Sequence, residues 1–557
     1  MSQSITIFCR NNNTYTEVPM GSSLLEIYKL VGSPLKNGPM NAQVNNRTVG
    51  LTYRCWHPKD VEFIDYSNRS GLRTYVRSLC HIFSKAVNDI LPQATMYLEY
   101  PISKGYYCVV HNGKAMNQDT LGKIKTRMQE IIDADIPFIP HTVQTTKAAE
   151  MFRQNGMKDK ALLLETSGML YTSYYELDGY INFFYGCLTP STGYINLFDI
   201  VPYADGLLLR IPKQSNMDEL EPVVPQDKMF EAYKQHLVLQ RTIGLDNVGD
   251  LNHAIQNGMT REIIMVSEAM QEKQVAKIAE EVTKRYHEPK GVRMVLISGP
   301  SSSGKTTFTK RLEIQLITNL LHPVSISLDD YFLCRQDTPL DENGEYDFES
   351  LYALDLKYFN SDLQKLLKGE EIEIPSFNFN TGNREYKGKK LRLNENSILV
   401  IEGIHALNPE LTAFIEDNFK YRVYVSALTS ISLDSHNWIP TTDNRLLRRI
   451  IRDYRFRGYS AQETISRWPS VRRGEDKWIF PFQENADATF NSAMLYELAA
   501  IRKFAEPILM EVHESDKENV DAYRLLRFLR YFNYIPAEIL PSTSLLREFL
   551  GGGSFKY

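Results

Sequence analysis

The segment from Met294 to Thr307, MVLISGPSSSGKTT, constrains the fold more than any other part of this chain. Four apolar residues, 294–297, predict a short buried strand. The residues after them fit the pattern G-x-x-x-x-G-K-[ST] of a phosphate-binding loop. Such a loop requires a strand before it and a helix after it, and we expect that helix to run to about Leu320. The chain should therefore contain a parallel α/β sheet built around this segment.

The expected loop offers backbone N–H groups, a lysine and a hydroxyl to a polyphosphate. Glycine at both ends of the pattern permits close backbone approach, and the following helix points its positive end at the same anion. Lys305 should reach the β- and γ-phosphates, and Thr306 should ligate Mg²⁺. The expected nucleotide-binding residues are Gly299, Ser301, Ser302, Ser303, Gly304, Lys305, Thr306 and Thr307. The alternative is a Gly/Ser turn with a surface lysine.

Composition excludes several classes of protein. The chain has 557 residues, enough for about three or four domains. Its 63 Lys and Arg against 68 Asp and Glu offer no overall attraction for nucleic acid or anionic membranes. The six cysteines show no C-x-x-C spacing, which argues against a disulfide framework and a zinc knuckle. Without a signal-like segment or a run of about 18 uncharged apolar residues, we expect a cytoplasmic protein that does not span a membrane.

Residues 1–66 carry the pattern of a small β-grasp domain. Ser4 to Arg10 alternates like a strand, and a short helix follows Ser23. Ala42 to Val49, with Asn45-Asn46 at its centre, predicts a hairpin. On these residues the segment resembles the TGS domain of threonyl-tRNA synthetases.

Residues 67–212 resemble the second, editing domain of the same synthetases, on the segments RSLCH and GYY. The editing site of that family has an H-x-x-x-H and a C-x-x-x-H pair, suited to binding metal or moving protons. The four matching positions here are Arg77, His81, Phe184 and Leu188. Since three of the four polar groups are missing, we expect a structural role for His81 and a binding or regulatory role for this half.

Two strands after the loop are each followed by a carboxylate. Val324 to Leu328 reads as a buried strand before Asp329, and Ile398 to Ile401 as another before Glu402. Loops at the carboxyl ends of parallel strands gather around the ligand, so both carboxylates should lie near the phosphates. Asp329 is the candidate base and Glu402 a candidate group for Mg²⁺. Alternatively, Asp329 caps a helix.

A predicted helix further along carries arginines on one face and apolar residues on the other. The arginines are Arg445, Arg448, Arg449, Arg452 and Arg455, and the apolar residues are Leu446, Leu447, Ile450, Ile451 and Tyr454. Arginines so close together repel one another unless anions offset them, and guanidinium groups suit phosphate oxygens. We expect them on a lid over the transferring phosphoryl group. The alternative is a solvated face with acidic neighbours.

Four motifs in order, GPSSSGKT, DDYF, IEGI and RLLRRIIRDYRFRG, resemble the uridine kinase and phosphoribulokinase family over roughly 292–493. The resemblance implies transfer of the ATP γ-phosphate to the 5′-hydroxyl of a nucleoside such as uridine or cytidine. It implies Asp329 as the base and the metal side at Thr306, Glu402 and Asp329. The implied lid arginines are Arg449, Arg452 and Arg457, with Lys305, Arg449 and Arg452 stabilising the transferring group.

The same resemblance implies an acceptor site at Asp329, Tyr331, Asp347, Phe377 and Arg384. The first aspartate would face the reacting hydroxyl, the second would hold the ribose, and the phenylalanine would lie near the base. The histidine that the family places shortly before the arginine is a glycine here, which leaves the base open. Alternatively, the phenylalanine packs in a core.

The sequence thus predicts a multidomain protein of α/β and α+β parts. We expect a β-grasp domain at 1–66, an α+β domain at 67–212, a linker and helical connector at 213–290, a doubly wound domain at 291–515 and a helical tail at 516–557, where no chemistry is expected. The expected ligands are ATP, Mg²⁺ and a nucleoside, and the expected assembly is a homo-oligomer. Two other classes stay open: a trans-acting aminoacyl-tRNA deacylase, and a nucleotide-dependent RNA-binding regulator without turnover.

Overall fold

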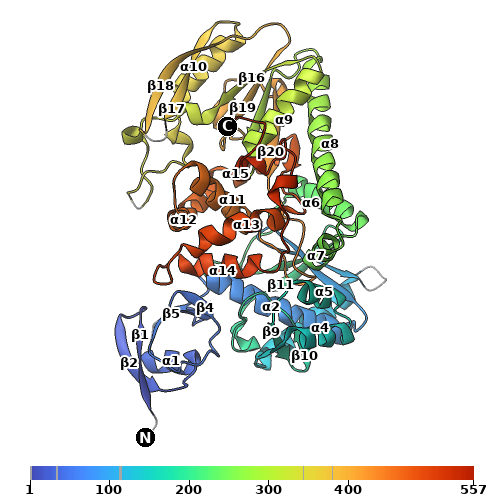
Figure 1. Ribbon diagram of the computed structural model, residues 1–557, viewed down its shortest axis with the longest axis vertical. Coiled ribbons are helices and arrows are strands. Elements are labelled where there is room, and N and C mark those ends of the chain that lie inside the picture. The colour runs from blue at the N-terminus through green and yellow to red at the C-terminus, as the bar shows by residue number, and fades with distance from the viewer. Residues whose placement is uncertain (1–2, 33–34, 112–115, 343, 379–380, 557) are drawn as a thin grey trace.

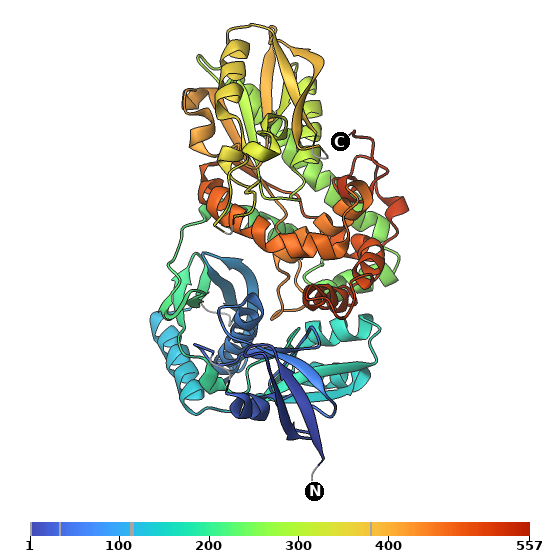
Figure 2. The same cartoon turned by 90° about the vertical axis from the view of Figure 1, so that its left-hand side faces the viewer.

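The computed structural model describes residues 3–32, 35–111, 116–342, 344–378 and 381–556. The N-terminal strands lie at one end of the long axis, and the strands around the phosphate loop lie towards the other end (Figure 1). Helices from late in the chain lie between the two ends in both views (Figure 2). They are α11 (Thr441–Phe456), α12 (Ala461–Trp478), α13 (Glu497–Met510) and α14 (Asn519–Leu529). None of the described helices is long and apolar enough to span a membrane.

The N-terminal sheet has the strand order β2-β1-β5-β3-β4. Its elements are β1 (Ser4–Cys9), β2 (Thr14–Pro19), α1 (Leu24–Val31), β3 (Asn41–Val44), β4 (Arg47–Val49) and β5 (Lys59–Ile64). Ser23 and Glu26 form a capping box that starts α1. The predicted hairpin turns at Asn45 and Asn46, whose φ angles of 48° and 55° lie in the left-handed region that asparagine tolerates.

The second part packs the long helix α2 (Arg69–Ile90) between two antiparallel sheets. One sheet contains β6 (Thr95–Ile102), β7 (Gly105–His111), β11 (Asp199–Tyr203) and β12 (Gly206–Arg210). The other contains β8 (Ile139–Gln144), β9 (Tyr171–Leu177) and β10 (Tyr180–Asn182). The helices α3 (Gln118–Asp133), α4 (Thr145–Gln154) and α5 (Lys158–Thr166) complete this part. Most residues of α2 are buried because it lies at the centre.

The connector differs from the prediction at its start. The stretch predicted to begin with a linker at residue 213 instead contains β14 (Asn216–Leu220), which pairs with β13 (Pro212–Lys213). Three helices follow, α6 (Asp227–Thr242), α7 (Val248–Gln256) and α8 (Thr260–Tyr286). The last of them lies where the sequence predicts a long amphipathic helix leading to the phosphate loop.

The third part is a five-stranded parallel sheet with the order β16-β19-β15-β20-β21. Its strands are β15 (Met294–Ser298), β16 (His322–Ser327), β19 (Ser397–Glu402), β20 (Lys420–Ser426) and β21 (Ala488–Asn491). On β15, Val295 and Ile297 pack with α8 and with α9 (Lys305–Thr318), whereas Met294 and Leu296 pack with α10 (Leu356–Leu367). Both faces of the sheet are therefore covered, as the predicted doubly wound fold requires. The hairpin of β17 (Ile372–Asn378) and β18 (Asn383–Leu391) projects beyond it.

The segment 427–440, between β20 and α11, inserts into the N-terminal half. Lys160 Nζ lies 2.6 Å from Asp434 Oδ1, and neither side chain is exposed. Asn437 donates to the carbonyl of Phe183 at 3.0 Å and accepts from the N–H of Tyr185 at 2.9 Å. A buried ion pair and backbone hydrogen bonds thus join the arginine helix to the second part of the molecule.

Removing one partner of the buried pair should be costly, because the other charge is then left without compensation. We expect Lys160→Met to lower the free energy of unfolding by about 3 kcal/mol. The double variant Lys160→Met/Asp434→Asn should recover most of that loss. Lys158→Met, at an exposed position two residues away, is the matched control. Urea unfolding of the full chain checks this, and equal stability of Lys160→Met and the control would contradict it.

Candidate active site

The phosphate loop has the geometry that its glycines predict. A Cβ on Gly299 would lie 2.0 Å from the carbonyl oxygen of Val425, so only glycine fits there. Gly304 has a φ of 84° and directly precedes the first residue of α9. The hydroxyls of Ser302 and Ser303 are buried and have no hydrogen-bond partner among the described residues. The loop thus presents glycine geometry and unused polar atoms at the start of a helix, as a phosphate site needs.

Thr306 and Glu402 meet beside the loop, as predicted. Thr306 Oγ1 donates to Glu402 Oε1 at 3.2 Å, and Oε2 is buried without a hydrogen-bond partner in the described part of the chain. Burial raises the pKa of the Glu402 carboxyl to about 7, although Lys305 acts to lower it. An unused carboxylate oxygen next to a threonine hydroxyl is the kind of ligand set that suits Mg²⁺.

Asp329 follows β16 in the short helix η2 (Leu328–Tyr331). The cap position of η2 is Ser327 and no side chain makes a capping bond, so the capping alternative for Asp329 is not found. The carboxyl is accessible to solvent yet closely surrounded by protein, and burial raises its pKa. Lys305, Arg457 and Arg452 oppose that rise in pKa, so the three cations lie close enough to Asp329 to act on its charge. The structure therefore gathers the predicted base, the loop lysine and two predicted lid arginines.

Two arginines of the predicted cationic face are buried and paired. Arg445 forms an ion pair with Glu475, and Arg448 one with Glu497. Each also donates to a carbonyl of the phosphate loop: Arg445 Nε to Ser301 at 3.0 Å, and Arg448 Nη1 to Ser302 at 3.3 Å. These two arginines hold α11 against the loop, so the expectation that all five arginines face the transferring phosphoryl group is wrong at both positions.

Arg449, Arg452 and the C-cap residue Arg457 remain near the site, whereas Arg455 lies over the ring of Phe504. Arg449 Nη1 donates to Ser301 Oγ at 2.8 Å, Arg452 Nη2 to Asp453 Oδ1 at 2.8 Å, and Arg457 lies 3.6 Å from the same carboxylate. One buried aspartate thus orients Arg452 and Arg457. The apolar face also needs a correction, because Tyr454 is 40% exposed.

Glu349, which no sequence motif singled out, lies near these charged groups. Burial raises its pKa to about 7; Arg449 and Lys305 lower the pKa, and Asp329 raises it. The predicted ribose contact, Asp347, instead uses Oδ1 to accept the N–H of Glu349 at 3.2 Å. The sequence offered one signal, a second carboxylate two residues after Asp347 in YDFES.

Of the remaining predicted acceptor residues, Phe377 and Arg384 join the β17-β18 hairpin to Phe332 at the end of η2, whereas Tyr331 contacts α10. Tyr331 is fully buried and donates its hydroxyl to Asp362 at 3.1 Å, so we leave it out of the acceptor site. The Phe377 ring lies 5.6 Å from that of Phe332. Arg384 donates to the carbonyl of Phe332 at 3.1 Å. Phe377 and Arg384 therefore lie beside the turn that carries Asp329. Their contacts in this structure are with other protein residues.

The four editing-type positions of the N-terminal half also come together. The His81 ring lies 5.5 Å from Phe138 and 5.3 Å from Phe184, and burial lowers its pKa to about 3. Leu188 is buried, and Arg77 Nε donates to the carbonyl of Cys187 at 3.0 Å. No cluster of His, Cys, Asp or Glu suited to a metal is found in the described ranges. The contacts fit the predicted structural role of His81.

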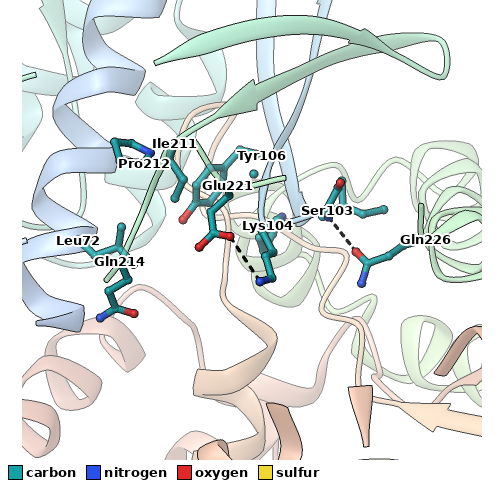
Figure 3. A pocket seen from close by; sticks show the side chains of 12 residues that line it. Leu72, Ser103, Lys104, Tyr106, Ile211, Pro212, Gln214, Glu221 and Gln226 are labelled. Carbon is teal, nitrogen blue, oxygen red and sulfur yellow. Dashed lines mark hydrogen bonds and ion pairs between the residues drawn. The ribbon is translucent and has the colours of Figure 1, made fainter. Parts of the chain in front are cut away.

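A hollow of about 330 Å³ lies by the β6-β7 turn of this half (Figure 3). Across it, Lys104 Nζ lies 3.4 Å from Glu221 Oε2. Its lining contains none of the site residues expected from the sequence.

Residues 294–498 match the model of the Phosphoribulokinase / Uridine kinase family. A uridine kinase of Staphylococcus aureus is 28% identical over 206 residues, which cover 36% of this chain and 86% of that protein. A solved structure described as a possible uridine kinase from Bacillus stearothermophilus is 17% identical, covers 39% of this chain and 98% of that one, and has a TM-score of 0.26. The resemblance stated from the four motifs is thus confirmed for this region.

The N-terminal half matches threonine-tRNA ligases. That of Symbiobacterium thermophilum is 24% identical over 189 residues, or 34% of this chain. The match covers 29% of that ligase, so the chain spans less than a third of its length. The resemblance to these synthetases is confirmed, while the TGS assignment of the first residues stays a prediction.

Because Mg²⁺ needs an ionised carboxylate, the pKa of Glu402 predicts a pH dependence. A carboxyl with a pKa of about 7 is about tenfold less ionised at pH 6 than at pH 8. We expect the Mg²⁺ affinity of the ADP-bound protein to rise by a similar factor between these pH values, measured by calorimetry. The isosteric Glu402→Gln variant should keep only the dependence due to the nucleotide itself. The same pH slope in both proteins would contradict the assignment.

Proposed function

We propose that the protein is an ATP- and Mg²⁺-dependent nucleoside kinase that phosphorylates the 5′-hydroxyl of a nucleoside, with uridine or cytidine favoured. The observation that carries this proposal is the accessible carboxylate of Asp329 among Lys305, Arg452 and Arg457. A base beside a phosphate loop, with cations around it, is what in-line phosphoryl transfer to a hydroxyl requires. The match to a uridine kinase over most of that protein's length supports a nucleoside as the acceptor.

Each group has a role that its surroundings support. Asp329 accepts the proton of the acceptor hydroxyl, for which a raised pKa makes it a stronger base. Lys305 and Arg449 stabilise charge on the transferring phosphoryl group. Thr306 and Glu402 would hold Mg²⁺, which supplies further neutralisation of the phosphate charges. Lys305 Nζ donates to the carbonyls of Gly299 and Pro300 in this structure. To reach the phosphates, the lysine would give up these two hydrogen bonds.

For the acceptor we propose a different carboxylate from the one first expected. Glu349 shares its electrostatic environment with Asp329 and Arg449, and a carboxylate there can accept two ribose hydroxyls. Asp347 orients it through the backbone N–H bond. Phe377 stays a proposed neighbour of the nucleobase.

The predicted RNA contact of the N-terminal half and the predicted homo-oligomer stay predictions.

The test is ADP release by the full chain with Mg²⁺ and ATP across a panel of nucleosides, ribulose 5-phosphate and no acceptor. We expect stimulation by a pyrimidine nucleoside. Asp329→Asn should lower kcat by a factor on the order of 10² to 10⁴, as loss of a general base does. Lys305→Ala should abolish turnover, and Asp337→Asn, an exposed carboxylate nearby, should leave it unchanged. If no nucleoside stimulates ADP release, the proposal is wrong. Near-normal turnover of Asp329→Asn would show that Asp329 is not the general base.

Glu349→Gln and Asp347→Asn form a matched pair that separates direct from indirect contact with the acceptor. Loss of a charged hydrogen-bond partner costs about 1.5–3 kcal/mol, so Glu349→Gln should raise the nucleoside KM roughly tenfold or more. Asp347→Asn keeps an acceptor oxygen for the Glu349 N–H and should change KM less. Steady-state kinetics with varied nucleoside measures both. A larger rise in KM for Asp347→Asn than for Glu349→Gln would instead assign the ribose contact to Asp347.

A further inference from the structure

The segment 541–550, for which the sequence suggested no chemistry, packs directly on the phosphate loop. It ends in the short helix α15 (Arg547–Leu550). Leu545 and Phe549 have no exposed area and belong to the core formed by β15 and α9. A Cβ on Gly304 would lie 2.7 Å from a methyl carbon of Leu545. The segment is therefore a fixed wall of the site.

This wall places a carboxylate at the start of α9. Glu548 Oε2 accepts from the Thr307 N–H at 3.2 Å and from Thr307 Oγ1 at 2.6 Å. Thr307 is the third residue of α9, in the first turn, where backbone N–H groups point out of the helix and make its end electropositive. These are the donors that a phosphate takes when a nucleotide binds such a loop.

A second carboxylate, that of Glu475, also accepts a backbone N–H of the loop, but it is held in place by ion pairs. Glu475 accepts the N–H of Ser301 at 3.1 Å, is fully buried, and pairs with both Arg445 and Arg472. Glu548 is only half-buried, and no Lys, Arg or His in the described part of the chain forms an ion pair with it. Its charge also acts to raise the pKa of Glu402, so the two carboxylates repel each other across the site.

We propose that the side chain of Glu548 is an internal occupant of the nucleotide site, which ATP must displace from Thr307 in order to bind. The inference rests on the nucleotide site of the proposed function, but not on the identity of the acceptor. Two anions cannot share the Thr307 donors, and the Glu548 carboxylate would also repel the triphosphate. Rotation of one side chain is enough to release the donors, because Leu545 and Phe549 keep the wall in place. The protein therefore binds ATP more weakly than its loop alone would allow.

The experiment compares ATP binding by the intact chain without acceptor, by calorimetry, in wild type, Glu548→Ala and Glu538→Ala. Glu538 is an exposed glutamate ten residues before Glu548 and serves as the matched control. We expect Glu548→Ala to tighten the Kd for MgATP by about two- to fivefold, the usual range for a charge at a helix end. The control should keep the wild-type Kd, and Lys305→Ala should lose binding.

Thermal unfolding gives a second readout, the rise in melting temperature caused by MgATP, which the loss of a merely structural group would not enlarge. Without nucleotide, Glu548→Ala should melt below wild type, since a capping group of α9 is gone. Saturating MgATP should then raise its melting temperature by more than it raises that of wild type.

An unchanged Kd for Glu548→Ala would make the residue a structural cap, and a weaker Kd would make it part of the ATP site; either result overturns the proposal. ATP binding that survives Lys305→Ala would also overturn it, because the ligand would then lie elsewhere. If the Kd tightens while no nucleoside stimulates ADP release, this inference stands and only the acceptor assignment fails.

Discussion

The two buried ion pairs of α11 hold the catalytic half together. A buried arginine is tolerated only when its charge is compensated, and Arg445 and Arg448 each have a glutamate partner with almost no exposed area. Both also bind carbonyl groups of the phosphate loop. The glutamates come from α12 and α13, so one network joins three helices of the middle layer to the loop. The position of the loop thus depends on buried arginine and glutamate side chains whose charges are used within the protein.

The N-terminal half is tied to the same helix from the other side. The segment before α11 forms the Lys160–Asp434 pair and bonds to the backbone on either side of Phe184. Phe184 is one of the positions at which the synthetase-like domain lacks a polar group. Where an editing site would need an open polar cavity, this protein has His81 among aromatic rings and a loop of the other half packed nearby.

Local patterns made much of the fold predictable. The phosphate loop, the strand before Asp329, the strand before Glu402 and the Asn45-Asn46 turn all depend on residues within a few positions of one another. The missed features depend on distant contacts. Thr307 and Glu548 are 241 residues apart, and the partners of Arg445 and Arg448 lie 30 and 49 residues away. An amphipathic helix pattern cannot tell a solvated arginine from one with a buried glutamate opposite, because both satisfy the same spacing.

The inserted segment between β20 and α11 also makes the two halves of the molecule depend on each other. A freestanding catalytic half would expose Trp438, which packs against Tyr106, and would leave Asp434 without its lysine. The synthetase-like half would in turn carry Lys160 with no counter-ion. Each half therefore completes the interior of the other, so neither half can be replaced on its own without leaving buried groups of the other half uncovered.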